Sequence, residues 1–427
     1  MYANFIWVLV GSALIGAGAS LVGSFTYLRK EALVGDAISH ALLPGVALSF
    51  LITGEKSLWV LFPGAFLTGW LSLPAISAIR KYSKIKSDSA IAIVLSVFFA
   101  VGIVLLTHIQ QGEYGNQSGL DAFLFGKAAS MLPRDITLFA WVDVILIATI
   151  TLLYPYLKAI TFDREFAHAA GLPVKILSTV LSALTVLAVA TGIQAVGVVL
   201  MAALVITPGA AARLFTKRLG TMLVTAMAIG VVSAVGGVFI SSLAPSMPTG
   251  PWIVVVLSVI AILSFLYAPK RGIMARRRRK RRHARKISEE NVLKLLYHHG
   301  ESSGKSAFTV AELLSTRKFD PVEFENDVNQ LIKKNRILRK DDRLSLTPEG
   351  LREATRVVRL HRLWELYLNE RLNLPPDHVH HDAEAIEHII TPELEAALVA
   401  ELGYPQIDPH RSAIPGVSHP HKNPRHE

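Results

Sequence analysis

Apolar residues dominate the first two thirds of the chain, in runs of about twenty residues separated by short polar segments. A helical run of that length is sufficient to cross the hydrocarbon core of a bilayer. The pattern therefore predicts a series of membrane-spanning helices. They are expected near residues 5–28, 34–53, 58–79, 89–108, 136–157, 219–243 and 251–268.

A further apolar stretch, residues 176–212, is too long for one helix. Gly192-Ile193-Gln194 and Thr207-Pro208-Gly209 are expected to interrupt it. Because basic residues flank both of its ends, the stretch must enter the membrane and return, as two short spans or a re-entrant pair. Residues 1–272 are thus expected to form an all-α polytopic membrane domain with about nine spans.

The loops between these spans differ in charge. Twelve Lys and Arg residues lie in loops on one side of the membrane and three on the other. Because basic loops stay in the cytoplasm, we expect a multi-pass protein of the cell (inner) membrane with its N-terminus outside. Everything after residue 268 is then cytoplasmic.

The pattern after residue 286 is that of a polar, mainly helical domain. The predicted elements are helices at 288–299 (capped by Ser288), 309–314 and 320–335, a β-hairpin at 336–346 and a helix that begins at Thr347. Helix, helix-turn-helix and hairpin is the order of a winged helix. We therefore expect a winged helix over 287–350, a helical metal-binding and dimerisation domain over 351–416, and a disordered His- and Pro-rich tail over 417–427.

Composition separates the same two parts. The chain is 51% hydrophobic and 18% charged, against about 25% charge in soluble domains. Only 10 of the 33 Asp and Glu residues lie in residues 1–286. An ordinary soluble enzyme is excluded. Because there is no cysteine, a metal must be held by His, carboxylate or backbone oxygen.

The net charge of +11 comes from one segment, residues 270–286, which holds eleven Lys and Arg residues and no acid. Residues 275–286 contain nine Lys and Arg among twelve residues, and we expect residues 273–286 to be a basic linker. Such a run either contacts anionic lipid next to a membrane span or binds nucleic-acid phosphates. The sequence alone leaves both open.

Asp36 and His40 are the notable ionisable residues in the predicted spans. Their i, i+4 spacing places them on one helix face, and carboxylate with imidazole suits Mn, Fe or Zn. The alternative is a pair that only satisfies itself. Pro44-Gly45 is expected to weaken the helix beyond them.

The loop at residues 162–173 is expected to contain a short amphipathic helix, capped by Asp163 and ended by Gly171 and Pro173. It is either a docking element for a cytoplasmic partner or an interfacial helix. The chain has no phosphate-binding loop of the G-x-x-x-x-G-K-[ST] type. If ATP drives transport, another subunit must hydrolyse it.

Residues 1–269 resemble the membrane permeases of manganese/zinc/iron ABC importers. The resemblance rests on Leu28-Arg29-Lys30, Gly35–Gly45, Phe162–Leu172, Gly192–Gly197 and Ile206–Ala211.

The resemblance to these permeases implies a transporter subunit, homodimeric or paired with a second permease, and no enzyme or organic cofactor. An extracytoplasmic binding protein would deliver the metal. Asp36 and His40 would line its path, and a cytoplasmic ATPase would dock on the helix of Asp163, Glu165 and Gly171. A secondary transporter or channel is the alternative, which the docking loop disfavours.

Residues 287–416 resemble the metal-dependent repressors of the diphtheria-toxin-repressor and manganese-repressor type. The matching segments are Arg359–Glu365, His380–Glu384, Ile386–His388, Gly403–Pro405, Pro409-His410 and Ile414-Pro415. The resemblance implies one regulatory metal site from Glu384, Glu387 and His388. It implies a second from His361, Glu365 and His380. Without the resemblance, a solvated charged face is the alternative.

The predicted DNA-reading helix is unusually acidic. It carries Asp320, Glu323, Glu325 and Asp327, which would repel phosphate, whereas Arg339, Lys340 and Arg343 in the hairpin could contact DNA. Two hypotheses follow: a metal-dependent DNA-binding repressor, or a gate that regulates transport without touching DNA.

Overall fold

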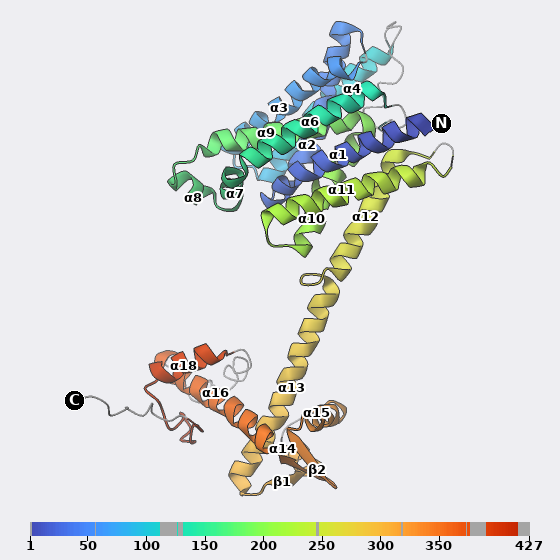
Figure 1. Ribbon diagram of the computed structural model, residues 1–427. Helices are drawn as coiled ribbons and strands as arrows, with labels where there is room; N and C mark the ends of the chain where they lie inside the picture. The colour runs from blue at the N-terminus through green and yellow to red at the C-terminus, as the bar shows by residue number, and fades with distance from the viewer. Residues whose placement is uncertain are drawn as a thin grey trace, which may run out of the picture. The chain divides into compact units, whose positions relative to one another are not determined.

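The computed structural model describes residues 2–55, 57–111, 126, 131–244, 247–316, 319–372, 374–375 and 390–416 (Figure 1). The chain divides into two compact units, Met1–Arg276 and Arg277–Glu427. The first unit is called here the membrane unit. The second is called the cytoplasmic unit, after the side of the membrane that the loop charges lead us to expect.

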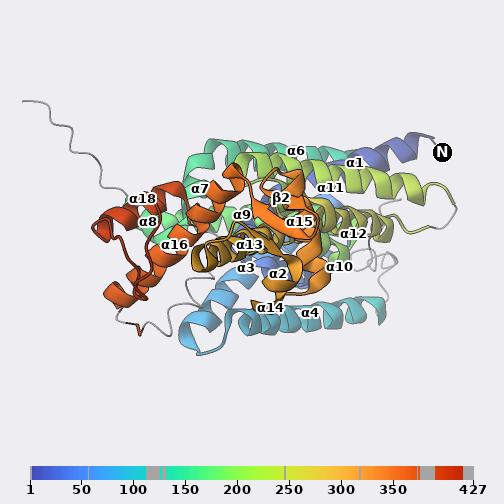
Figure 2. The same cartoon turned by 90° about the horizontal axis from the view of Figure 1, so that it is seen from below.

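The membrane unit consists of helices. They are α1 (Tyr2–Leu28), α2 (Ala32–Thr53), α3 (Leu58–Tyr82), α4 (Ser87–Gln111), α6 (Pro133–Leu152), α7 (Tyr154–Phe162), α8 (Arg164–Ala169), α9 (Val174–Val196), α10 (Val198–Phe215), α11 (Leu219–Ser241) and α12 (Thr249–Tyr267). Within the described residues, eight are long and apolar enough to span a membrane, and Met201–Phe215 of α10 is a shorter apolar helix. Helix α1 packs against α6, α9, α10 and α11. Figure 2 shows it beside α6 and α11.

The long stretch 176–212 does form two helices, but it breaks elsewhere than expected. The break is at Gly197, whose φ of 85° is accessible to glycine. Gly192 and Pro208 lie inside α9 and α10, so the predicted interruptions were wrong. A side chain at Gly192 would collide with Met201, so this glycine permits close packing.

Helix α2 continues through Pro44 to Thr53, so the weakening expected at Pro44-Gly45 does not end the helix. Helices α3 and α4 pack closely against the turn of α2 that contains Pro44 and Gly45. A Cβ at Gly45 would collide with the Gly64 carbonyl of α3, and one at Gly102 of α4 would lie 3.1 Å from Pro44 Cδ. Small residues thus let three helices approach closely.

The remaining elements are α13 (Ile273–Ser303), β1 (Ala307–Thr309), α14 (Val310–Thr316), α15 (Pro321–Lys333), β2 (Ile337–Lys340), β3 (Arg343–Leu346), α16 (Pro348–Leu372) and α18 (Pro392–Glu401). The predicted winged-helix order is confirmed. The antiparallel sheet has the order β1-β3-β2, with Leu338 opposite Ser345 and Phe308 opposite Leu344. Strand β1 was not predicted, because three residues are too few to show an alternating pattern.

The basic segment is helical, in contrast to the linker expected at residues 273–286. Helix α13 is continuous, so Ser288 is no cap; its hydroxyl instead bonds to Asp327 of α15. Lys and Arg are good helix formers. Arg285 and Lys286 also pair with Glu289 and Glu290 one turn later, at 3.5 and 3.4 Å, which supports the helix across the expected boundary.

Candidate metal sites and docking surface

Asp36 and His40 lie on the same face of α2, with His40 Nε2 3.6 Å from Asp36 Oδ1. Both side chains are partly buried. The rings of His40 and Phe99 of α4 are nearly perpendicular, with 4.8 Å between their centres. His40 Nδ1 is buried and has no hydrogen-bond partner in the described part of the chain. A carboxyl oxygen and imidazole nitrogens are thus held side by side in an apolar helix.

The loop after α7 contains the expected short helix, α8. Asp163 Oδ1 accepts the N–H of Phe166 at 2.8 Å and caps it, and Gly171 takes a positive φ of 77° just beyond its end. Arg164 donates to Ser178 of α9 at 3.2 Å. Helices α7 and α8 lie together at one end of the membrane unit (Figure 1).

The side chains exposed around α8 are apolar as well as charged. Phe166 is 64% exposed, Ile176 is 65% exposed, and Glu165 is exposed beside them. Sequence reasoning singled out Asp163, Glu165 and Gly171 and missed Phe166, although its place in the capped helix was a usable signal. An exposed aromatic side chain on a short helix is suited to contact with another protein or with the membrane interface.

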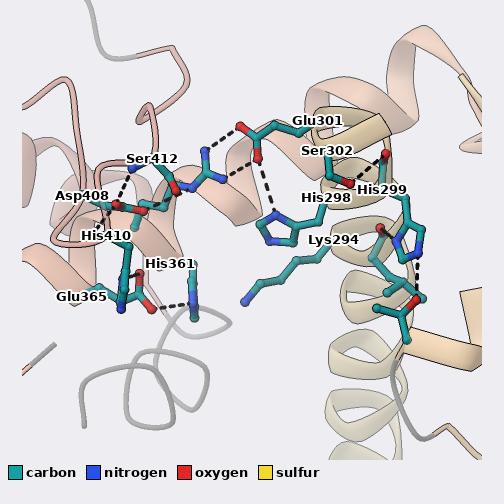
Figure 3. A pocket seen from close by; sticks show the side chains of 13 residues that line it. Lys294, His298, His299, Glu301, Ser302, His361, Glu365, Asp408, His410 and Ser412 are labelled. Carbon is teal, nitrogen blue, oxygen red and sulfur yellow. Dashed lines mark hydrogen bonds and ion pairs between the residues drawn. The ribbon is translucent and has the colours of Figure 1, made fainter. Parts of the chain in front are cut away.

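In the cytoplasmic unit, His361 and Glu365 of α16 form a buried pair, with 3.0 Å between His361 Nε2 and Glu365 Oε1. His410 Nδ1 lies 3.8 Å from Glu365 Oε2. Ligand atoms of Glu365, Asp408 and His410 all lie within 4.8 Å of one another (Figure 3). Two carboxylates and an imidazole are a donor set that fits Mn, Fe or Zn.

Asp408 and His410 were not predicted as ligands, although Asp-Pro-His at 408–410 is a recognisable signal. The loop itself positions Asp408, whose Oδ1 accepts the backbone N–H groups of His410 and Ser412 at 2.9 and 2.8 Å. The other predicted ligands lie outside the described residues. They are His380, Glu384, Glu387 and His388.

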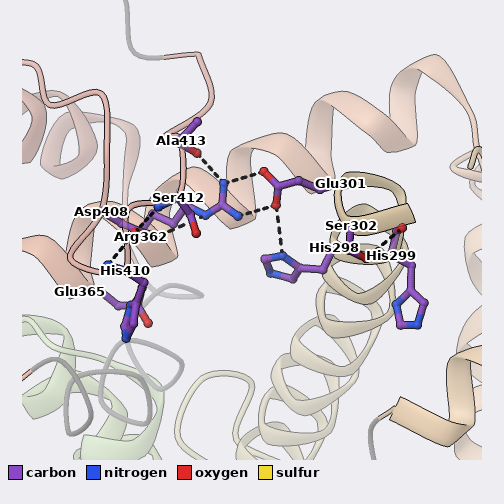
Figure 4. A network of polar contacts seen from close by, with 10 residues as sticks. All are labelled: His298, His299, Glu301, Ser302, Arg362, Glu365, Asp408, His410, Ser412 and Ala413. Atoms are coloured by element: carbon purple, nitrogen blue, oxygen red, sulfur yellow. Dashed lines mark hydrogen bonds and ion pairs between the residues drawn. The ribbon is translucent and has the colours of Figure 1, made fainter. Parts of the chain in front are cut away.

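Arg362 joins this cluster to α13. Its buried guanidinium binds both carboxylate oxygens of Glu301, at 3.0 and 2.5 Å, and its Nε lies 3.6 Å from Asp408 (Figure 4). Hydrogen bonds from Arg362 hold the pKa of Glu301 below its usual value. Burial, with Lys294 and Arg362 nearby, lowers the pKa of His298 to about 4.

The lowered pKa of His298 predicts a pH dependence of stability. In the unfolded chain His298 titrates near pH 6.5, so between pH 6.5 and 4 the unfolded state binds a proton that the folded state does not. The unfolding free energy of the cytoplasmic unit should therefore fall as pH falls through this window. Amide hydrogen exchange of residues 292–296 at several pH values measures this unfolding free energy. His298→Gln should flatten the decline between pH 6.5 and 5, and an unchanged slope would contradict the assignment.

Glu325 and Asp327 of α15 are less available to repel DNA than the sequence indicated, whereas Glu323 is exposed on the helix and Asp320 is exposed at its start. Asp320 caps the helix through the N–H groups of Val322 and Glu323, at 2.9 and 3.0 Å. Glu325 pairs with Arg339 of the hairpin, and Asp327 is buried against Ser288.

A family model described as the ABC 3 transport family matches residues 1–268. The chain belongs to the ABC 3 transport family. A second model, the metal binding and dimerisation domain of iron dependent repressors, matches residues 347–416 of this family member.

Similar proteins include the manganese transport system membrane protein MntC of Bacillus subtilis (strain 168). It is 41% identical over 374 residues, which cover 87% of this chain and 86% of MntC. A probable metal transport system membrane protein of Chlamydia trachomatis is 28% identical over 96% of each chain. The solved structure of PsaBC from Streptococcus pneumoniae in complex with Fab matches with a TM-score of 0.57 and 34% identity. The match covers 64% of this chain and 98% of that one.

This ABC 3 family member is therefore a multi-pass membrane protein and a transporter subunit rather than an enzyme. It carries a metal-transport permease and, fused to it, a C-terminal part of the iron dependent repressor type. The predicted combination of the two families is confirmed.

Proposed function

We propose that this chain is the permease subunit of an ATP-driven importer of manganese, zinc or iron, and that its cytoplasmic unit senses the imported metal. The observation that carries the proposal is the Asp36–His40 pair in α2. Ionisable groups inside a membrane helix are costly unless they pair or act on a substrate. Relatives named as manganese and zinc transport proteins support the substrate class.

On the transport path, the Asp36 carboxylate offsets part of the cation's charge and His40 offers a nitrogen lone pair. Neither group is a soft thiolate, so the site suits metals that accept oxygen and nitrogen ligands. Two protein ligands hold an ion weakly enough for release, which alternating access requires. The expected assembly has two permeases, either two copies of this chain or one with a second permease.

The ATPase is proposed to dock from the cytoplasm on α8, with Asp163, Glu165 and Gly171 shaping the helix and Phe166 making apolar contact. The extracytoplasmic metal-binding protein then faces the opposite side. Charge bias in the loops supports this orientation, with the N-terminus outside and the cytoplasmic unit inside. Reconstitution with the ATPase should give ATP-dependent uptake of radioactive manganese, zinc or iron. Uptake that proceeds equally without ATPase would instead support a secondary transporter.

Replacing Phe166 by Asp should weaken ATPase co-purification at least tenfold. The change places a charge where an aromatic ring would be desolvated, and truncating an interface aromatic alone costs about 2 kcal/mol or more. Affinity pull-down of the ATPase measures the effect. Leu243→Asp, at an exposed position just beyond α11 and at the opposite end of that span, is the control and should co-purify normally.

The regulatory metal is proposed to bind among His361, Glu365, Asp408 and His410, where the described donor set fits it. A bound metal would link α16 to the loop at residues 406–414 through charge-assisted ligand bonds. His380 remains a proposed ligand of this site. Glu384, Glu387 and His388 remain the proposed ligands of a second site.

DNA binding is the second candidate function of the cytoplasmic unit. The observation that favours it is that Glu325 and Asp327 of α15 are engaged elsewhere, while Asn326 and Asn329 are exposed on the helix beside the exposed acid Glu323. Lys340 and Arg343 stand exposed in the hairpin. Metal-dependent binding of the full chain to the promoter DNA of its own gene would support a repressor, provided that Arg343→Glu abolishes this binding. Metal-inhibited transport without DNA binding would support a gate.

A further inference from the structure

The basic part of α13 divides into two regions of different electrostatic character. Residues 276–282 are seven consecutive Arg and Lys residues, all exposed, and none forms an ion pair with a described residue. No acid lies within four positions of any of them. Arg285 and Lys286, by contrast, pair with Glu289 and Glu290. We call residues 276–282 the basic collar.

The collar has charge on every side of the helix. Seven successive residues cover almost two turns at 3.6 residues per turn, about 10 Å of helix. A helix that lies flat in a membrane keeps one apolar face, which the collar lacks. It is therefore built to attract a surface of phosphate groups rather than to insert among acyl chains.

The start of α13 is held close to the last span. Helix α12 ends at Tyr267, and Ala268 is fully buried. Gly272 N–H donates to the Ala268 carbonyl at 2.9 Å, and Arg271 donates to the carbonyl of Arg213, in the last turn of α10, at 3.2 Å. Arg276, four residues beyond Gly272, is then about 6 Å further along the helix than Gly272. This distance is shorter than the Debye length of about 8 Å in physiological salt, so salt only partly screens the attraction between Arg276 and charges at the level of Gly272.

The neighbouring side chains favour a lipid surface over a nucleic acid. Ile273 and Met274, three and two residues before the collar, are 45% and 39% exposed, and Tyr267 is also exposed. Contact with a bilayer interface is energetically favourable for apolar and aromatic side chains, whereas contact with a phosphate backbone is not. Toward the winged helix, acids neutralise the remaining basic residues.

We propose that the basic collar binds the anionic phospholipid headgroups that surround the end of α12. Each basic residue near such a surface contributes attraction that salt weakens. This contact goes beyond the proposed transport function and does not depend on any metal.

The experiment uses the full chain in lipid nanodiscs. Because the chain has no cysteine, Ala284→Cys, at an exposed position of α13, creates a single site for a fluorophore. Nitroxide attached to a fixed fraction of phosphatidylcholine headgroups quenches the label when it is near the surface. Quenching should rise when phosphatidylglycerol is added to the discs, and the rise should vanish in about 1 M salt, where the Debye length is about 3 Å.

Arg278→Gln/Arg279→Gln should lower the ratio of surface-bound to free label roughly thirtyfold, given about 1 kcal/mol for each basic residue and tenfold for each 1.4 kcal/mol. Arg285→Gln/Lys286→Gln removes the same charge from paired residues and should leave quenching as in the native chain. Equal quenching with and without phosphatidylglycerol, or equal loss in both variants, overturns the proposal. It is also overturned if quenching stays at the phosphatidylcholine level while random-sequence duplex DNA raises the anisotropy of the label.

Discussion

Replacing Asp36 by Asn should reduce ATP-dependent metal uptake by at least about a hundredfold. Loss of a supporting residue in the outer shell of a metal site already costs ten- to a hundredfold, and Asp36 is a proposed direct ligand. Asn keeps the size of the side chain but removes the negative charge that offsets the cation. His40→Gln should act in the same direction, because it removes the imidazole 3.6 Å away. Radioactive manganese uptake into proteoliposomes measures both.

The matched control is Asp143→Asn, the same chemical change at another buried carboxylate of the membrane unit. Asp143 lies on α6 against Gly18 of α1, and it is expected to have a structural role. Its variant should retain most of the uptake. Membrane insertion and ATPase co-purification must be equal in both variants. Uptake by Asp36→Asn within twofold of the native chain would exclude Asp36 from the path.

Replacing Glu365 by Gln should abolish the stabilisation of the cytoplasmic unit by metal. A ligand at 100 to 1,000 times its dissociation constant stabilises a protein by about 3–4 kcal/mol. Glu365 is the side chain that adjoins both His361 and His410, so its loss removes the centre of the donor set. Thermal unfolding of the full chain, monitored by hydrogen exchange in α16, measures the stabilisation by manganese, iron(II) or zinc in the native chain and in the variant.

Glu370→Gln is the control for this experiment. Glu370 is an exposed acid on the same helix and is not among the residues that line the pocket around Glu365. The variant should therefore keep the full metal response. Without metal, Glu365→Gln should remain folded because Gln is close in size to Glu. A metal response that survives in Glu365→Gln would place the regulatory ion elsewhere, with Glu384, Glu387 and His388 as the remaining candidates.

Local patterns predicted the helices of this chain well and their interruptions poorly. Apolar run length is a property of the sequence alone, so most spans were located close to their observed bounds. The span expected at 136–157 is an exception, because α6 ends at Leu152 and α7 begins at Tyr154. Whether a glycine or proline ends a helix depends on what surrounds it. Gly192 and Pro208 stay inside helices, whereas Gly197 adopts a positive φ and separates α9 from α10.

The candidate sites divide in the same way. Asp36 and His40, or His361 and Glu365, are one helical turn apart, so their meeting follows from helix geometry. Asp408 and His410 reach Glu365 from a loop more than forty residues later in the sequence. No periodicity connects such distant segments, and only packing brings them together.

The sequence by itself determined the membrane helices, the winged-helix order, the pairs at i, i+4 spacing and the capped helix at Asp163, because each depends on interactions within one or two turns. The tertiary structure decided which glycine breaks the long stretch and that α13 runs unbroken through the basic segment. It also decided which acids of α15 are neutralised and which carboxylate completes the donor set at Glu365. These features depend on side chains from other elements, whose positions are set only when the apolar faces of the helices pack together.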